Sequence, residues 1–195
     1  MHCTSPRLAI AAVLVLAFAS TRVGAAQDSP SGAAGSDLGG LHDFDLRAGH
    51  WLVHHRRLKE RLADNHEWQE FDGTQDCRLL MDGYANVDEN FFDMPGGAAY
   101  KGVTLRSYDP KTGQWSIWWL DGRTPSDPLD PPVRGRFVDG VGTFYADDTL
   151  RGKPIRIRFI WSNISANGAH WEQAFSPDGG KTWETNWTTD FRRAP

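Results

Sequence analysis

The sequence is poor in cysteine and in basic charge. Of its 195 residues only Cys3 and Cys77 are cysteines, and Cys3 lies in a segment that resembles a cleavable leader. Cys77 would then be alone, which excludes an internal disulfide and favours a buried rather than a reactive thiol. Lys and Arg number 21 against 25 Asp and Glu, a net charge of −4 that disfavours nucleic acid as a partner.

Motifs that identify several catalytic classes are missing as well. The sequence has no Cys–x–x–Cys or His–Glu–x–x–His spacing, no Gly–x–Ser–x–Gly elbow and no glycine loop placed between a strand and a helix. These absences predict that the protein has no metal site, and they argue against nucleophilic catalysis and against phosphate binding by a glycine-rich loop.

The first 25 residues have the pattern of a secretory signal peptide. Arg7 precedes the apolar run Leu8–Ala19, which is too short to span a bilayer, and small residues follow at the cleavage position. We therefore expect an exported protein, periplasmic or extracellular, with no stable membrane span after cleavage. Residues 26–40 are rich in Gly, Ala and Ser and are expected to form a flexible linker, which leaves 41–195 as the folded domain.

After the linker, short β-rich runs alternate with turn signals, which predicts an all-β protein. Ile155, Ile157 and Phe159 fall on one face of such a run and Arg156 and Arg158 on the other, the period-2 pattern of a strand with one core face. The expected strands are His50–Leu58, Glu67–Leu79, Ala85–Asp93, Tyr100–Tyr108, Gln114–Leu120, Val133–Val138, Gly142–Ala146, Pro154–Ser162, Ala169–Phe175 and Thr182–Phe191.

The links between these runs are short, which favours an up-and-down antiparallel meander. Closing about ten strands into a single β-barrel removes the exposed edges and leaves an interior wide enough for a small ligand. Leu41–Gly49 is expected to form a short N-terminal helical turn that Gly49 ends. We place the mouth of the barrel near Asp121–Pro132, because only this link is long enough to act as a lid.

The residues Gly49, His50 and Trp51 open the first expected strand directly after the helical turn. They resemble the Gly-x-Trp signature of the calycin barrels, which are the lipocalins, fatty-acid-binding proteins and nitrobindin-like proteins. The resemblance implies a lipocalin-like barrel whose floor is closed by Trp51, with Arg192 or Arg193 lying across its ring. The chain as a whole is similar to small exported bacterial proteins of unknown function.

Residues 176–183, SPDGGKTW, match the Asp-box pattern S-x-D-x-G-x-T-W at every position. Sialidase-like propellers repeat this motif once per blade, whereas this chain has a single copy, so a propeller is excluded. We expect a turn in which Asp178 binds the turn amides and Trp183 packs beneath it, without glycosidase chemistry.

Three histidines crowd the first expected strand, at His50, His54 and His55. Strand geometry places His50 and His54 on one face and His55 on the other, so the three cannot converge on one metal ion. We expect no cofactor, with haem held by His54, His55 or His170 as the alternative.

Nine tryptophans are spread over most of the expected strands. They either fill the core or line a pocket for an apolar ligand, and the pattern leaves both possibilities open. The candidates for lining such a pocket are Trp51, Trp68, Glu89, Trp118, Arg134, Arg136, Tyr145, Trp161 and Trp187.

Charged residues within the strands are a second functional hint, since an unpaired charge in an apolar interior is costly. Arg134 and Arg136 share one face and suit a carboxylate or phosphate, or are simply solvated. Glu89 and Glu172 are candidates for a general acid or base in a buried position. The sequence alone leaves open which face of each strand points inward.

These features favour an exported barrel that binds a small hydrophobic or amphipathic molecule. One alternative is a cofactor-free isomerase, cyclase or hydratase that acts on an apolar substrate through a buried carboxylate. The others are a haem-binding barrel and an extracytoplasmic adaptor that has a filled interior and no ligand.

Overall fold

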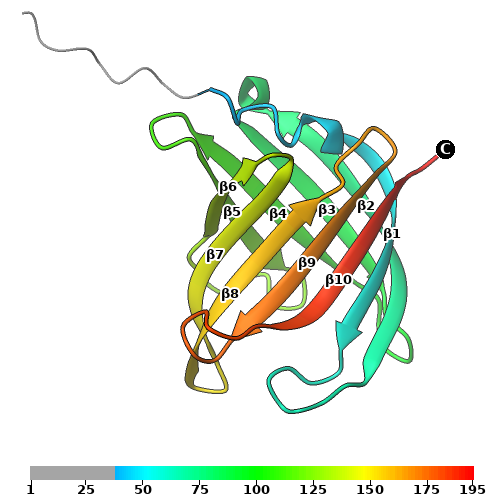
Figure 1. The fold of residues 1–195 in the computed structure, drawn as a ribbon. Helices are drawn as coiled ribbons and strands as arrows, with labels where there is room; N and C mark the ends of the chain where they lie inside the picture. Colours follow the sequence, from blue (N-terminus) through cyan, green and yellow to red (C-terminus); the bar gives the residue numbers. More distant parts are fainter. Residues whose placement is uncertain (1–37) are drawn as a thin grey trace, which may run out of the picture. The chain divides into compact units, whose positions relative to one another are not determined.

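The computed structural model describes residues 38–195, where ten antiparallel strands close into one barrel (Figure 1). Each strand pairs with its neighbours in sequence and the first pairs with the last, so the expected all-β up-and-down barrel is confirmed. Its elements are η1 (Asp45–Arg47), β1 (Gly49–Leu58), β2 (Trp68–Leu80), η2 (Met81–Gly83), β3 (Ala85–Asp93), β4 (Tyr100–Asp109), β5 (Gln114–Asp121), β6 (Val133–Val138), β7 (Val141–Leu150), β8 (Lys153–Ser162), β9 (Gly168–Ser176) and β10 (Glu184–Arg193).

The expected signal peptide, residues 1–25, and residues 26–37 of the expected linker lie outside the described residues. Export therefore stays a prediction. In the part of the chain that the structure describes, no helix is long and apolar enough to cross a membrane.

Side chains alternate between the interior and the outer surface along most of β1, although Leu58, which has the parity of the outer face, is also buried. Trp51, Val53 and His55 are buried inside the barrel, whereas His50 and His54 are exposed. The expected division of the three histidines between two faces is confirmed.

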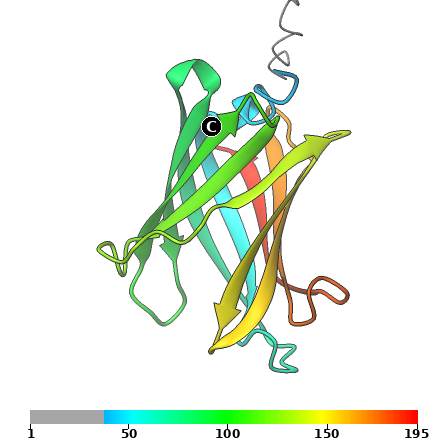
Figure 2. The ribbon, with the colours of Figure 1, turned by 90° about the vertical axis from the view of Figure 1, so that its left-hand side faces the viewer.

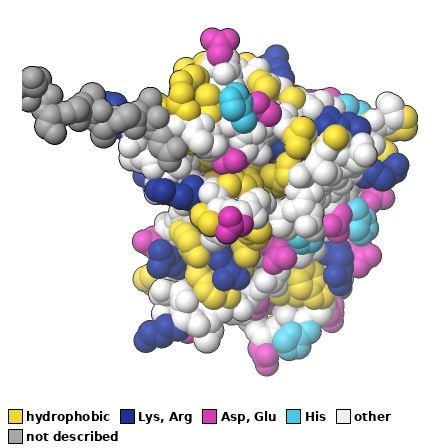
Figure 3. Space-filling model, turned by 45° about the horizontal axis from the view of Figure 1, so that its top comes forward, with side chains coloured by type: hydrophobic (Ala, Val, Ile, Leu, Met, Phe, Trp, Pro, Cys, Tyr) yellow, Lys and Arg dark blue, Asp and Glu magenta, His cyan; other side chains and the backbone are white. Residues whose placement is uncertain are grey.

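Aromatic rings pack one end of the barrel solidly. Phe44, from the N-terminal turns (blue in Figure 1), is fully buried, and its ring centroid lies 5.1 Å from that of Trp115 and 5.7 Å from that of Trp161. Both contacts are edge-to-face, the geometry that aromatic quadrupoles favour. The N-terminal turns thus close this end, and Figure 3 shows acidic and basic side chains interspersed over the surface around it.

The floor of the barrel is built on Trp51, as the calycin resemblance implies. The Arg193 Cζ lies 3.9 Å from the Trp51 ring centroid and the Arg47 Cζ lies 4.3 Å from it, both in cation–π range. The Trp51 indole N–H donates to the Arg47 carbonyl at 2.7 Å. Gly49 has a φ of 120°, and a side chain there would collide with the Arg193 guanidinium, so glycine is required at this place.

The Asp-box forms the expected turn between β9 and β10. The Asp178 carboxylate accepts hydrogen bonds from the amides of Lys181 and Thr182 at 3.0 and 2.9 Å and from the Thr182 hydroxyl at 2.7 Å. These bonds hold the pKa of Asp178 well below its usual range. The Trp183 indole N–H donates to the Gly180 carbonyl at 3.0 Å, so the motif stabilises a turn.

The wall of the barrel is weakest between β5 and β6. Only Trp115–Ile117 of β5 pair with β6, and the rest of β5 continues toward the open end while the chain crosses over in the link 122–132 (Figure 2). By contrast, β7 and β8 are paired over nine consecutive positions. The long link therefore spans the side of the barrel where two strands diverge.

We expect Trp51→Ala to lower the free energy of unfolding by about 3–5 kcal/mol, because it leaves a cavity under two guanidinium groups. Trp68→Ala is the matched control, since Trp68 is half-buried beside the exposed Arg56, and it should cost less than about 1 kcal/mol. Urea denaturation measures both values. Equal losses in the two variants would contradict the floor assigned to Trp51.

Candidate functional site

The half of the barrel opposite the aromatic floor is hollow, with a cavity of about 550 Å³. All ten strands contribute side chains to its walls, and Arg123, Asp130 and Pro131 of the link 122–132 reach its edge. The mouth therefore lies beside this link, as expected. A volume of this size suits a single small organic molecule.

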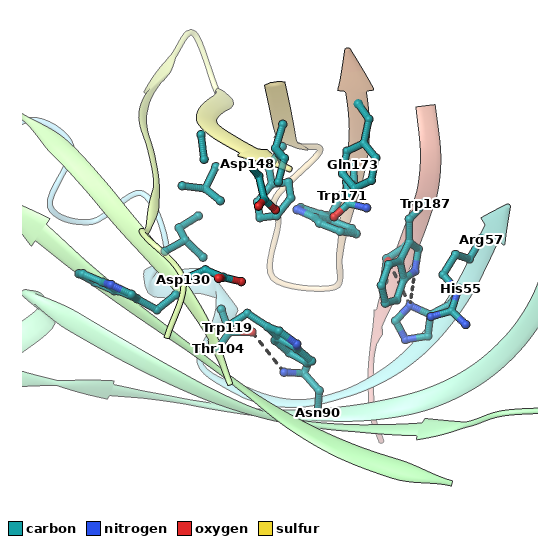
Figure 4. Close-up of a pocket in the computed structure, with 18 of the residues that line it drawn as sticks. His55, Arg57, Asn90, Thr104, Trp119, Asp130, Asp148, Trp171, Gln173 and Trp187 are labelled. Atoms are coloured by element: carbon teal, nitrogen blue, oxygen red, sulfur yellow. Dashed lines mark hydrogen bonds between the residues drawn. The ribbon is translucent and has the colours of Figure 1, made fainter. Parts of the chain in front are cut away.

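Aromatic rings form a nearly continuous wall on one side of the cavity. Phe92 bridges Trp119 and Trp187, with ring centroids 5.9 and 6.1 Å away, and Trp171 stands edge-on to Trp187 at 5.8 Å (Figure 4). Phe159 continues the series at 5.0 Å from Trp171. Such a wall offers flat apolar surface to a ligand and little hydrogen bonding.

A layer of buried polar groups lies at the inner end of the cavity, beside the aromatic floor, of which Trp161 and Phe191 also line the cavity. Arg106 and Asp88 form an ion pair at 2.6 Å in which both side chains are at most 2% exposed, and Arg106 also donates to the Asn86 Oδ1 at 2.8 Å. The Gln75 side-chain amide donates to the Asn90 Oδ1 at 2.8 Å. Arg106, Gln75 and Asn90 line the cavity, so its inner end is polar.

Arg47 and Cys77 complete this layer on the side of the floor. Arg47 is fully buried and donates to the Gln75 Oε1, and burial lowers its pKa to about 9 while Asp88 acts to raise it. The Cys77 thiol is buried as expected, and burial together with Asp88 raises its pKa, which keeps it protonated and unreactive. Two arginines face one aspartate, so the layer carries a net positive charge.

His55 is the one histidine among residues 38–195 that lines the cavity. The Trp187 indole N–H donates to its Nδ1 at 3.3 Å (Figure 4). This nitrogen also lies 3.0 Å from the Thr189 hydroxyl, and the ring stacks on Phe71 at 4.8 Å. An indole N–H only donates, so Nδ1 is the acceptor and the ring proton is on Nε2. Burial lowers the pKa of His55 to about 3, so the imidazole is neutral.

The other strand histidines are engaged on the outer face, each beside an aspartate. Within residues 38–195, no three His, Cys, Asp or Glu side chains are grouped so that they could hold a metal ion. The pairs are His50 with Asp76 at 2.7 Å, His54 with Asp72 at 2.8 Å, and His170 with Asp190 at 2.6 Å.

Of the nine residues expected to line a pocket, Trp118, Trp161 and Trp187 line the cavity. Trp51 lies beneath the polar layer, in the floor. The other five do not reach the cavity: Trp68 packs beside Arg56, Glu89 pairs with Lys101 on the outer face, Arg134 donates to the Ser116 hydroxyl, Arg136 donates to the Thr112 carbonyl, and Tyr145 packs against Trp183 and Arg156.

Glu89 is a candidate for the interior in the sequence analysis, and it shares its face of β3 with Val87 and Phe91. That face is the outer one, where Glu89 lies 2.5 Å from the Lys101 ammonium and Phe91 is 37% exposed. Glu172, the second candidate acid or base, also does not line the cavity and lies 3.3 Å from His170. Neither glutamate is therefore available to a ligand in the barrel.

The sequence analysis missed several residues that line the cavity, among them Arg57, Arg61, Asn90 and Trp171. The parity of Trp171 with Phe175 was visible in the sequence and would have placed it inside. Arg57 and Arg61 carry no comparable signal, because charged residues near a strand end are usually solvated. Their position depends on how the barrel closes.

No family model matches the sequence, and no curated protein matches it. Among solved structures, the S-type phycobiliprotein lyase CPES from Guillardia theta is similar, with a TM-score of 0.55 and 10% identity over 78% of this chain and 90% of that one. The fold is that of a calycin-like barrel. Weaker matches are EF1p2_mFAP2b bound to DFHBI (TM-score 0.41, 12% identity, 80% of this chain and 99% of that one) and a DUF3598 family protein of unknown function from Nostoc punctiforme (0.21, 6%, 80% and 99%).

This calycin-like barrel should lose stability in mild acid because of His55. The unfolded chain protonates this imidazole below its ordinary pKa of 6.5, whereas the folded protein keeps it neutral down to about pH 3. The unfolded state therefore binds more protons in this window, and stability falls as the pH falls. Between about pH 7 and 5 we expect His55 to account for a loss of about 2 kcal/mol in the free energy of unfolding.

His55→Gln should remove this part of the pH dependence, which urea denaturation at the two pH values measures. His54→Gln is the matched control, because His54 is exposed on the outer face and pairs with Asp72. If His55→Gln and the unsubstituted protein lose the same stability on acidification, the neutral buried state of His55 is wrong.

Proposed function

We propose that this protein binds a small amphipathic molecule inside the open half of its barrel. The observation that carries the proposal is the cavity of about 550 Å³, walled by aromatic rings and polar at its inner end and at its mouth. Apolar ligand sites have this composition, in which surface burial supplies affinity and a few polar groups fix orientation.

The division of the interior supports binding rather than simple core packing. Phe44, Trp51 and Trp115 fill the floor to full burial, whereas Trp171, Trp187 and Trp119 leave space beside them. An adaptor without a ligand was expected to have a filled interior, and the cavity disfavours that alternative. We also propose export, for which the support is the signal-like pattern of Arg7 and Leu8–Ala19.

The remaining alternatives lose the residues on which they relied. The isomerase, cyclase or hydratase hypothesis needed Glu89 or Glu172 in the cavity, and neither lines it. The haem hypothesis needed a histidine free to act as ligand. His54 and His170 lie on the outer face, and the hydrogen bond that the Nδ1 of His55 accepts from Trp187 leaves the ring proton on Nε2, so neither nitrogen of His55 offers a free lone pair.

The neutral fluorescent amine N-phenyl-1-naphthylamine tests the proposal, because it is flat, apolar and emits strongly only out of water. We expect saturable binding to the unsubstituted protein. Ala146 lines the cavity, and Ala146→Phe should fill part of it. We expect this substitution to raise the dissociation constant by at least about tenfold, or about 1.4 kcal/mol.

The control is Thr143→Phe, which adds a ring to the same strand on the side that faces away from the cavity. It should leave the dissociation constant unchanged. The proposal fails if the unsubstituted protein does not bind the probe, or if Ala146→Phe binds it as tightly as Thr143→Phe does. Native mass spectrometry of protein purified from its own host would then give the mass of a retained ligand.

A further inference from the structure

Five basic side chains line the cavity, and two of them differ from the rest. Three are neutralised by a carboxylate within hydrogen-bond distance. These pairs are Lys59 with Glu67 at 2.7 Å, Arg106 with Asp88 at 2.6 Å and Arg123 with Asp121 at 2.6 Å.

Arg57 and Arg61 are the two others, and within residues 38–195 neither has a carboxylate oxygen within 4.0 Å. The Arg57 guanidinium lies over aromatic rings, with its Cζ 5.0 Å from the Trp187 centroid and 5.5 Å from that of Phe71. The Arg61 Cζ lies 6.0 Å from the Phe175 centroid, and its Nε is buried without a hydrogen-bond partner in the part of the chain described.

The surroundings of Arg61 make its charge unfavourable. Burial lowers its pKa, and the positive charges of Arg57, Arg123 and Arg151 lower it further, with only Tyr100 acting in the opposite direction. Half-buried like charges that face one another raise the free energy of the folded state. An anion placed between them would remove that cost.

We propose that the ligand carries an anionic group, a carboxylate or a similar oxyanion, that lies against Arg57 and Arg61 at the mouth. This inference rests on the proposed function, since the apolar body of the same molecule would fill the cavity below. A guanidinium presents a planar fork of N–H donors that matches two oxygens of an oxyanion, and it pairs with carboxylates better than an ammonium group does.

The acidic residues of the cavity support this orientation. Asp130 and Asp148 line it on the side opposite to Arg57, one from the link 122–132 and the other from β7 (Figure 4). They repel an anion from that side. The deep arginine, Arg106, is less available to a ligand, because it is already held by Asp88 and Asn86 and is 1% exposed.

Two probes that differ by one sulfonate group test this inference. N-phenyl-1-naphthylamine is neutral, and 8-anilinonaphthalene-1-sulfonate is the same ring system with an added anion. The ratio of their dissociation constants isolates the contribution of the charge. We expect Arg57→Gln and Arg61→Gln each to weaken binding of the sulfonate by about tenfold, the loss of a charge-assisted hydrogen bond, with binding of the amine unchanged within about twofold.

Arg134→Gln is the matched control, because Arg134 lies on the outer face and donates to Ser116. It should leave both dissociation constants unchanged. In the unsubstituted protein, added salt should weaken binding of the sulfonate more than binding of the amine. Arg61→Gln should also keep or raise the thermal midpoint, since it removes a charge that nothing in the described chain balances.

Each outcome decides the matter. Weaker binding of the sulfonate probe in Arg57→Gln and Arg61→Gln, with unchanged binding of the amine, supports the inference. If the amine binds and the sulfonate ratio is unchanged in both variants, the anion site at the mouth is overturned while the proposed function stands. If neither probe binds the unsubstituted protein, the proposed function fails and this inference fails with it.

Discussion

The ion pair between Arg106 and Asp88 is the interaction on which the interior of this barrel depends. Removing two charges from water is expensive, and a close approach of the opposite charges offsets that cost. Here the guanidinium and the carboxylate lie 2.6 Å apart, and Asn86 accepts a hydrogen bond from the guanidinium. Losing either partner would leave the other charge buried and unpaired, so we expect substitution of one partner to destabilise the whole polar layer. Burial lowers the pKa of Arg47 to about 9, and the nearby Asp88 acts in the opposite direction.

This polar layer lies between two regions that have different tasks. On one side, Phe44 and Trp51 belong to a floor packed to full burial, and the basic groups of Arg47 and Arg193 cover the Trp51 ring. On the other side, the walls are aromatic but leave a cavity of about 550 Å³. Stability resides in the floor, so the open half can keep a hollow that an ordinary core would fill. The binding that we propose would therefore not require the closed end of the barrel to move.

Much of the architecture was predictable from local patterns, whereas the inner surface was not. Gly49 and Trp51 identified the floor because they resemble a family signature, and the Asp-box turn was confirmed bond by bond because its residues are close in sequence. Which face of β3 points inward was left open, and the ordinary rule is reversed there: polar Asn86, Asp88 and Asn90 are buried while Phe91 is partly exposed. The partners that make this burial possible lie on other strands, so no single strand reveals it.

The short ladder between β5 and β6 gives the barrel a compliant side. Every other neighbouring pair of strands is paired over at least five positions, whereas in β5 only Trp115–Ile117 pair with β6. Backbone hydrogen bonds are what make a sheet resist stretching, so the wall yields first along this line. For the ligand binding proposed above, we expect the width of a ligand to depend on how far β5 and β6 can separate, and its length to be limited by the polar layer beneath.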